Sequence, residues 1–278
     1  MKVCFIRSPK QRSAVLTDLM GRLSRRGLTV SEWIPDRSVQ DLDLVPRYDL
    51  YVLKSRTPLA VSLAGVLHHR GARLLNPYPS CVRLLDKCVV TAVLRDAGIP
   101  APRSWATMDP SLCMPIATAD PRPLVVKPYN GIHSRSITVA RAAQDLARPP
   151  AGGEPVLVQE FVDGCTERLK IHCVGERVFA TRKPFSLGGT HTPGRPTKIS
   201  DQVRAMAVAC GRLLGLGLFG MDVLESADGP VVVDVNSFPG YRGVPGAAQA
   251  VAEYIEGIAR DRVTLPLDTG RIEAQHRS

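Results

Sequence analysis

Six residues near the C-terminal end of the chain, Val231 to Asn236, constrain its fold more than any other stretch. Four of the six are valines, and such an apolar, β-branched run predicts a buried strand. Since side chains alternate along a strand, Asp234 and Asn236 are expected on one face, with Val233 and Val235 on the other. Carboxylate and amide oxygens are ligands that suit Mg²⁺. The stretch therefore predicts a metal site at the end of a strand.

A second apolar run that carries one acid, residues 218–224, precedes the valine strand. Asp228-Gly229 lies between the two runs and is a hairpin turn signal, so the strands are expected to pair. Pairing would bring Asp222 close to Asp234 and Asn236, and we expect these three side chains to be the metal ligands. The alternative is that they are strand-end acids that only cap turns.

The composition favours a protein with a sizeable core and an anionic partner. The 278 residues are 44% hydrophobic, enough for two or three subdomains. No apolar run reaches the ~18 residues that a membrane span requires, so no membrane partner is expected. A net charge of +10 favours nucleotides and phosphorylated metabolites, whereas an aromatic content of 5% argues against nucleic acid. Seven cysteines without a disulfide or metal spacing indicate reduced thiols, and hence a cytoplasmic protein.

The first 79 residues alternate predicted strands and helices. Strands are expected at 2–6, 28–34, 48–53 and 73–75, and helices at 14–26 and 59–70. This order predicts a small α/β domain with a mostly parallel sheet, whose ligands lie beyond the carboxyl ends of the strands. Four cations follow strands and form either an anion-binding rim or solvated loop charges: Arg7, Lys10, Lys54 and Arg56.

Residues 80–154 are expected to form a second subdomain. One helix is predicted over 81–97, carrying Asp86-Lys87 and ended by a Gly-Ile-Pro-Ala-Pro turn. A buried strand at 124–128 brings Lys127 to its end, where a lysine requires a partner. The small polar loop that follows, residues 130–136, offers amides and hydroxyls that suit phosphates.

Residues 155–265 are expected to form a third subdomain with the metal site, and 266–278 a flexible tail. The patterns predict a strand at 156–161, a hairpin over 168–181, and helices at 201–214 and 246–258.

In this order, the motifs resemble the ATP-grasp superfamily. The resemblance covers residues 76–258 and implies an α/β (α+β) fold, an ATP-grasp fold with an N-terminal Rossmann-like pre-ATP-grasp domain. The matching pieces are Asp86-Lys87 before the Gly-Ile-Pro-Ala-Pro turn, Val-Val-Lys127-Pro, Val-Gln159-Glu160-Phe161, Asp222 and Asp234-x-Asn236.

Two branches of this superfamily are similar to the chain. The segments at 219–222, 234–244 and 170–176 resemble the inositol trisphosphate kinase branch, which implies transfer of the γ-phosphoryl group of Mg-ATP to a small anionic acceptor. Lys183-Pro184 stands where that branch has Arg-Pro-Ser, and lysine lacks the bidentate phosphate recognition of arginine. The alternative is a ligase similar to the ribosomal-protein S6 modification enzyme (RimK-like), which joins a carboxylate to an amine through an acyl phosphate. Such ligases usually have Glu-x-Asn, where this chain has Asp234-x-Asn236.

The resemblance implies a role for each candidate residue, with ATP and one or two Mg²⁺ ions as cofactors. The expected metal ligands are Asp222, Asp234 and Asn236. The phosphates of ATP are expected to contact Lys87, Lys127, Ser134 and Ser136. The adenine is expected at Gln159, Glu160, Phe161 and Val162, and the ribose at Glu167. Catalysis is expected to involve Lys183 or Arg182, with His133. The acceptor, a small anionic metabolite, is expected at Arg7, Lys10, Lys54, Arg56 and Gly240. A non-catalytic nucleotide-binding module is the third hypothesis, disfavoured because the full metal set is present.

Overall fold

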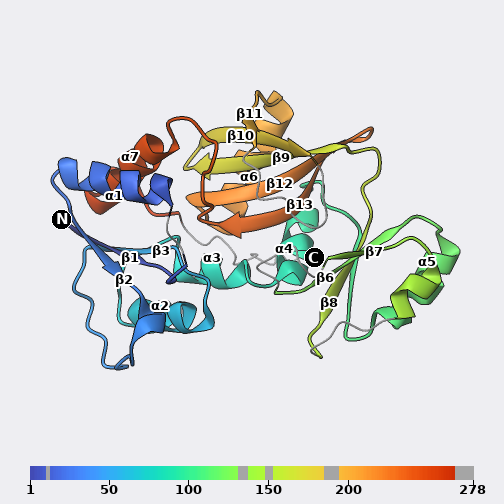
Figure 1. The fold of residues 1–278 in the computed structure, drawn as a ribbon, viewed down its shortest axis with the longest axis horizontal. Helices are drawn as coiled ribbons and strands as arrows, with labels where there is room; N and C mark the ends of the chain where they lie inside the picture. Colours follow the sequence, from blue (N-terminus) through green and yellow to red (C-terminus); the bar gives the residue numbers. More distant parts are fainter. Residues whose placement is uncertain (11–12, 131–136, 148–152, 185–193, 267–278) are drawn as a thin grey trace, which may run out of the picture.

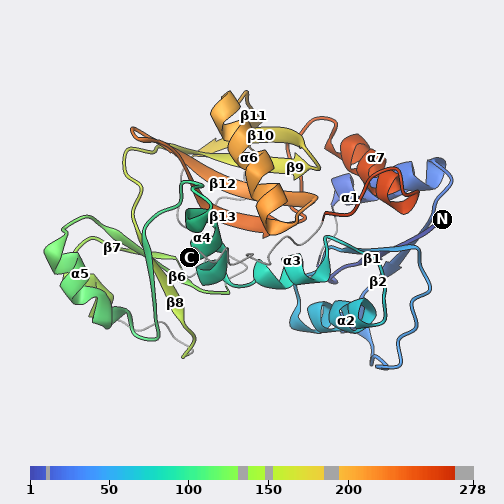
Figure 2. The same ribbon diagram turned by 180° about the vertical axis from the view of Figure 1, so that it is seen from behind.

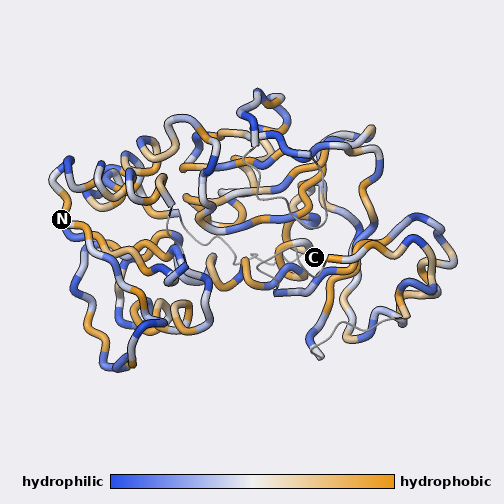
Figure 3. Tube along the Cα trace, in the orientation of Figure 1, coloured by the Kyte–Doolittle hydropathy of each residue, from blue (hydrophilic) through white to orange (hydrophobic). Residues whose placement is uncertain are grey.

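The computed structural model describes residues 1–10, 13–130, 137–147, 153–184 and 194–266. Three sheets lie next to one another, and the helices pack around them (Figure 1). The apolar stretches follow the strands and the inner sides of the helices (Figure 3). None of the helices in these ranges is long and apolar enough to cross a membrane.

The N-terminal sheet is parallel, with the strand order β2-β1-β3-β4. This confirms the α/β alternation read from the sequence. Ser13 caps the first helix by accepting a hydrogen bond from the backbone N–H of Leu16, as serine does at helix starts. The elements are β1 (Lys2–Ile6), α1 (Ala14–Arg25), β2 (Thr29–Trp33), η1 (Pro35–Arg37), β3 (Leu50–Leu53), α2 (Pro58–His69) and β4 (Leu74–Leu75).

Two helices occupy the region in which the sequence predicts one. They are α3 (Tyr78–Arg83) and α4 (Lys87–Asp96), so the single helix expected over 81–97 is wrong. The reason is Asp86, whose carboxylate accepts hydrogen bonds from the N–H groups of Cys88 and Val89 and so caps the start of α4. Lys87 is therefore the first residue of α4 and not, as predicted, a residue in the interior of a longer helix.

The central sheet is antiparallel, with the order β5-β8-β6-β7. One face packs on short helices through a small apolar core that includes Leu146 and Val158. The other face carries Lys127 and Gln159. Its elements are β5 (Ser104–Thr107), η2 (Pro110–Cys113), α5 (Met114–Ala119), β6 (Leu124–Pro128), β7 (Thr138–Ala140), η4 (Ala143–Ala147) and β8 (Val156–Glu160).

The C-terminal sheet is antiparallel, with the order β11-β10-β9-β12-β13. Helix α6 covers one of its faces (Figure 2), where Leu169, Ile171 and Met221 join the apolar core. Strand alternation leaves the opposite face to the polar residues of the same strands. Its elements are β9 (Glu167–Val174), β10 (Arg177–Pro184), β11 (Arg195–Pro196), α6 (Asp201–Leu214), β12 (Leu218–Ser226), β13 (Gly229–Ser237) and α7 (Ala247–Ala259).

The closing helix α7 packs against α1 of the N-terminal sheet (Figure 1). Leu19 and Leu23 of α1 share one buried core with Val251 and Ile255 of α7. Arg26 adds an ion pair of 2.8 Å with Glu256. Burial of this apolar surface joins the end of the chain to its beginning.

Candidate functional site

Asp222 and Asp234 face each other across β12 and β13 as direct partners in the antiparallel register. The next pair along is Val223 with Val232, so Val233 has no partner opposite and the register shifts there. Such a bulge changes the direction of the side chains on one strand. It explains why Val232 and Val235 are both buried beneath α6, and it corrects the expected pairing of Val233 with Val235 on one face.

Asp234 and Asn236 share a face, as the sequence predicts. The Asn236 Nδ2 donates to Asp234 Oδ2 at 2.6 Å. Lys87 reaches the other carboxylate oxygen, with Nζ 3.1 Å from Asp234 Oδ1. Lys127 lies beside them, with its Nζ donating to the carbonyl of Val233, the bulged residue, at 3.0 Å. The two predicted phosphate lysines and the two predicted metal ligands of β13 therefore meet at one place.

Burial and the neighbouring charges shift the pKa values of Lys127 and Asp234. Burial lowers the pKa of Lys127 to about 8, and the charge of Asp234 opposes that shift. Burial by itself raises the pKa of Asp234, but Lys87, Lys127 and the amide of Asn236 outweigh it, so that the pKa lies below its ordinary value. Asp234 is therefore an ionised carboxylate, ready to bind a cation.

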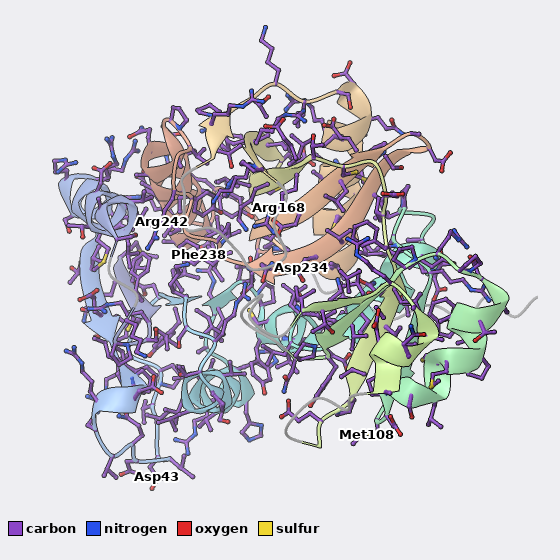
Figure 4. All side chains as sticks on the ribbon, turned by 45° about the vertical axis from the view of Figure 1, so that its right-hand side comes forward. Asp43, Met108, Arg168, Asp234, Phe238 and Arg242 are labelled. Atoms are coloured by element: carbon purple, nitrogen blue, oxygen red, sulfur yellow. The ribbon has the colours of Figure 1, made fainter. Side chains whose placement is uncertain are left out.

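Asp222 is held by two cations of β9: Lys170 is its register partner in the β12–β9 pairing, and Arg168 lies two residues earlier on the same face. Lys170 Nζ lies 3.2 Å from Asp222 Oδ1, and Arg168 Nη1 lies 3.2 Å from Oδ2. No motif in the sequence predicts a role for Arg168. The i, i+2 spacing with Lys170 indicates that the two share a face, but only the strand pairing shows which face that is. Figure 4 shows Arg168 and Asp234 on the side of the C-terminal sheet away from α6.

Arg182 and Lys183 lie on opposite faces of β10, as neighbours in a strand must. Arg182 pairs with Glu225 at 2.8 Å and with Glu167 at 3.7 Å. Lys183 is the register partner of Arg168. Burial lowers the pKa of Lys183, as do the charges of Lys170 and Arg168. Of the two predicted catalytic cations, the structure brings Lys183 to the face of Asp222 and places Arg182 away from it.

Glu167 lies on the same face of the sheet as Arg182, opposite the face that carries Lys170. Its carboxylate pairs with Arg195 at 3.1 Å as well as with Arg182. Two arginines therefore hold the carboxylate, on the face away from Asp222, and the ribose contact expected of Glu167 stays a prediction.

The predicted adenine segment runs out of β8. Gln159 is 3% exposed, and its Nε2 donates to Ser104 Oγ at 2.8 Å. Glu160 points to the opposite face, where Arg122 lies 3.1 Å away and a cavity of about 230 Å³ opens. The N–H groups of Glu160 and Phe161 donate to the carbonyls of Arg103 and Pro123. These N–H groups hold the edge of the sheet, and Phe161 and Val162 follow half-buried. The role of Gln159 to Val162 in binding adenine stays a prediction.

The predicted acceptor cations separate into two groups. Lys54 and Arg56 reach the end of β13: Lys54 donates to the carbonyls of Phe238 and Pro239, and Arg56 donates to Asn236 Oδ1 at 2.6 Å. Burial, with the charges of Arg56 and Arg242, lowers the pKa of Lys54 to about 7. Figure 4 shows Phe238 and Arg242 in this region, and Gly240 is exposed next to Pro239.

The other two cations stand apart from the metal residues. Arg7 is 4% exposed, and its guanidinium pairs with Glu32 at the ends of β1 and β2. Lys10 is exposed on the following turn. The predicted rim of four cations is therefore not one surface, because Glu32 takes up the charge of Arg7. His133, Ser134 and Ser136 lie outside the described residues.

Comparisons with known proteins show the family of this chain. Residues 84–240 match the ATP-grasp domain family. A relative from Shewanella amazonensis, named a probable alpha-L-glutamate ligase 2, is 30% identical and the match covers 78% of this chain and 79% of the relative.

Two solved structures share the fold. A RimK domain ATP-grasp protein from Sphaerobacter thermophilus has a TM-score of 0.74 at 19% identity, covering 92% of this chain and 100% of that protein. The ATP-grasp ligase PsnB, in complex with a precursor variant, Mg and ADP, has a TM-score of 0.68 at 20% identity, covering 92% and 97%. The chain therefore belongs to the ATP-grasp family and is an ATP-dependent enzyme.

Proposed function

We propose that this enzyme is a carboxylate–amine ligase that uses the γ-phosphoryl group of ATP to activate an acid. The observation that carries the proposal is the pairing of Asp222 with Asp234 in a chain whose 30% identical relative is named a glutamate ligase. That name favours the ligase hypothesis over the kinase hypothesis, which the motif around Asp234 had favoured. Glutamate is accordingly the first acid to test.

The residues fit the cofactors that the family implies. The side-chain oxygens of Asp222, Asp234 and Asn236 form a hard donor set, which would hold one or two Mg²⁺ ions. Mg²⁺ bound there would neutralise charge on the β- and γ-phosphates of ATP. Lys87 and Lys127 lie 3.1 and 3.0 Å from groups of β13 and would turn to the phosphates.

The reaction divides into two steps. In the first, an oxygen of the acid attacks the γ-phosphorus, the bond to the β-phosphate oxygen breaks, and an acyl phosphate and ADP form. In the second, the amine attacks the acyl carbon, phosphate leaves and the amine loses one proton. Lys183, Lys170 and Arg168 form a cationic group beside Asp222, which suits both an acidic substrate and the charge of the transferring phosphoryl group.

Trapping with hydroxylamine tests the proposal. The purified enzyme is incubated with Mg-ATP, L-glutamate and hydroxylamine, which replaces the unidentified amine. We expect ADP and a glutamyl hydroxamate in equal amounts, because hydroxylamine captures an acyl phosphate. A panel of other carboxylic acids follows if glutamate is inert. A stable phosphomonoester formed with ADP would instead support the kinase hypothesis, in which the acceptor is a hydroxyl group.

A further inference from the structure

Arg56 ties the N-terminal sheet to the strand that carries two of the proposed metal ligands. It lies between β3 and α2 and is half-buried. Its Nη1 donates to Asn236 Oδ1 at 2.6 Å, and its Nη2 donates to the carbonyl of Ser237 at 3.0 Å. Two bonds from one guanidinium to acceptors on neighbouring residues fix the direction of that group as well as its distance. The sequence predicts that Arg56 binds the acceptor, and in the structure both of its bonds reach the end of β13.

These contacts leave the Asn236 amide only one orientation. A guanidinium can only donate hydrogen bonds, and an ionised carboxylate can only accept them. The oxygen of the amide must therefore face Arg56, and its nitrogen must face Asp234 Oδ2, 2.6 Å away. Rotation of the amide by half a turn would set Arg56 against an N–H group and Asp234 against an oxygen, so each partner opposes it and the two together oppose it more strongly.

We propose that Arg56 is a positioning residue that holds the Asn236 oxygen in place as a metal ligand. The proposal rests on the proposed function, in which Asp234 and Asn236 bind Mg²⁺. A carbonyl oxygen has two lone pairs, so Asn236 Oδ1 keeps one for a cation while it accepts from Arg56. Partners of this kind, which orient metal ligands, typically contribute a factor of about 10 to 100 in metal affinity.

The test measures binding of a metal ion without any acceptor or turnover. Mn²⁺, as a probe for Mg²⁺, is titrated into the protein with a substoichiometric amount of ADP, and bound Mn²⁺ is followed by electron paramagnetic resonance. Arg56→Ala should bind Mn²⁺ about tenfold more weakly than the wild type. Its affinity for ADP in the absence of metal should be unchanged. Arg56→Lys keeps the charge but has one compact ammonium group in place of the forked guanidinium. Its Mn²⁺ affinity should lie between those of Arg56→Ala and the wild type.

Arg73→Ala is the matched control. Arg73 also joins the N-terminal sheet to the C-terminal part of the chain, donating at 2.8 Å to the Ile258 carbonyl and at 2.8 Å to Asp261. It does not touch β13, so its loss should leave Mn²⁺ affinity as in the wild type. Equal Mn²⁺ affinity in Arg56→Ala and the wild type, or tighter binding in the variant, would overturn the proposal.

Failure of the proposed function gives a different result. If the wild-type protein with ADP binds no Mn²⁺, or if Asn236→Ala binds it as well as the wild type, the metal site itself is assigned wrongly. If the wild type binds Mn²⁺ and Asn236→Ala binds it more weakly, but Arg56→Ala has the Mn²⁺ affinity of the wild type, only the role of Arg56 is wrong.

Discussion

Asp222 and Asp234 are register partners on neighbouring strands, and each is held by lysine or arginine side chains from other elements. Two carboxylates placed directly opposite each other repel, and cations between or beside them offset this repulsion. Lys87 of α4 contacts Asp234, and Lys170 and Arg168 of β9 contact Asp222. The pair is thus an acidic site surrounded by cations, which suits the proposed binding of Mg²⁺ and polyphosphate.

Removing the charge of Asp234 should abolish turnover without unfolding the protein. We expect Asp234→Asn to lower Mg²⁺-dependent ADP formation by at least about 100-fold, because the ligand loses its charge. Glu256→Gln is the control: Glu256 lies on α7, its side chain is 12% exposed, and it pairs with Arg26 and Arg260 rather than with a residue of the site. That change should alter the melting temperature and leave the rate intact. Retained activity in Asp234→Asn would contradict the metal assignment.

Lys183 and Arg182 should differ sharply when each is replaced by alanine. Lys183→Ala should lower kcat by about 100-fold, since Lys183 lies on the face of Asp222. Arg182→Ala should leave kcat within a few-fold and cost about 1 kcal/mol of stability or less, because its ion pairs are partly exposed. Steady-state kinetics and urea unfolding of both variants measure this difference. Equal losses of kcat would refute the assignment of faces.

Binding of ADP should depend on the proton of Lys127. The pKa of this lysine is lowered to about 8 by burial, so the side chain loses its charge as the pH rises through that value. A phosphate binds the protonated form, so affinity should be level below pH 8 and fall by up to about tenfold per pH unit above it. Calorimetry between pH 7.5 and 9.5 measures the slope. Lys127→Met should bind ADP weakly at every pH and should lack this fall in affinity. If the ADP affinity of the variant falls with pH as steeply as that of the wild type, Lys127 is not the group responsible.

His172 should make the fold less stable in acid. It is 2% exposed and Nδ1 lacks a hydrogen-bond partner within the described part of the chain. Burial lowers its pKa to about 3, and the neighbouring charges of Lys170 and Lys183 act in the same direction. Nε2 lies 3.5 Å from Thr181 Oγ1, and the ring lies 5.6 Å from that of Tyr241. The imidazole is therefore neutral in the folded protein above this value.

The direction of the effect follows from proton linkage. Between pH 6.5 and about 3 the unfolded chain binds a proton at His172 that the folded chain does not, so stability falls as the pH falls through this window. At pH 5 the loss should be about 2 kcal/mol relative to neutral pH. Urea unfolding of the wild type and of His172→Leu at pH 7 and pH 5 isolates this contribution. If both proteins lose the same amount, His172 is not its source.

Most of the fold follows from local patterns in the chain. The apolar alternation of the first 79 residues predicts the parallel sheet, and the valine run with Asp228-Gly229 predicts the β12–β13 hairpin. The helix at 201–214 agrees with α6. These patterns are local because periodicity and turn residues act within one or two elements.

The site is harder to predict where it depends on register. The bulge at Val233 and the contact of Arg168 with Asp222 arise from pairing between strands distant in sequence. Asp86 looks like a residue within a helix until its two capping bonds are seen. Likewise, nothing in the sequence shows that Glu32 takes the charge of Arg7, or that Arg56 meets Asn236. A long-range contact leaves no periodic trace in the chain.

The most direct test of the ligase proposal follows one oxygen atom. The enzyme is supplied with Mg-ATP, hydroxylamine and L-glutamate labelled with ¹⁸O in its carboxylates, and the released phosphate is examined by phosphorus NMR. An acyl phosphate intermediate carries a carboxylate oxygen to phosphorus, so the phosphate should contain one ¹⁸O atom. Phosphate without ¹⁸O, released as the labelled acid is consumed, or a lasting phosphomonoester in its place, would contradict the proposal.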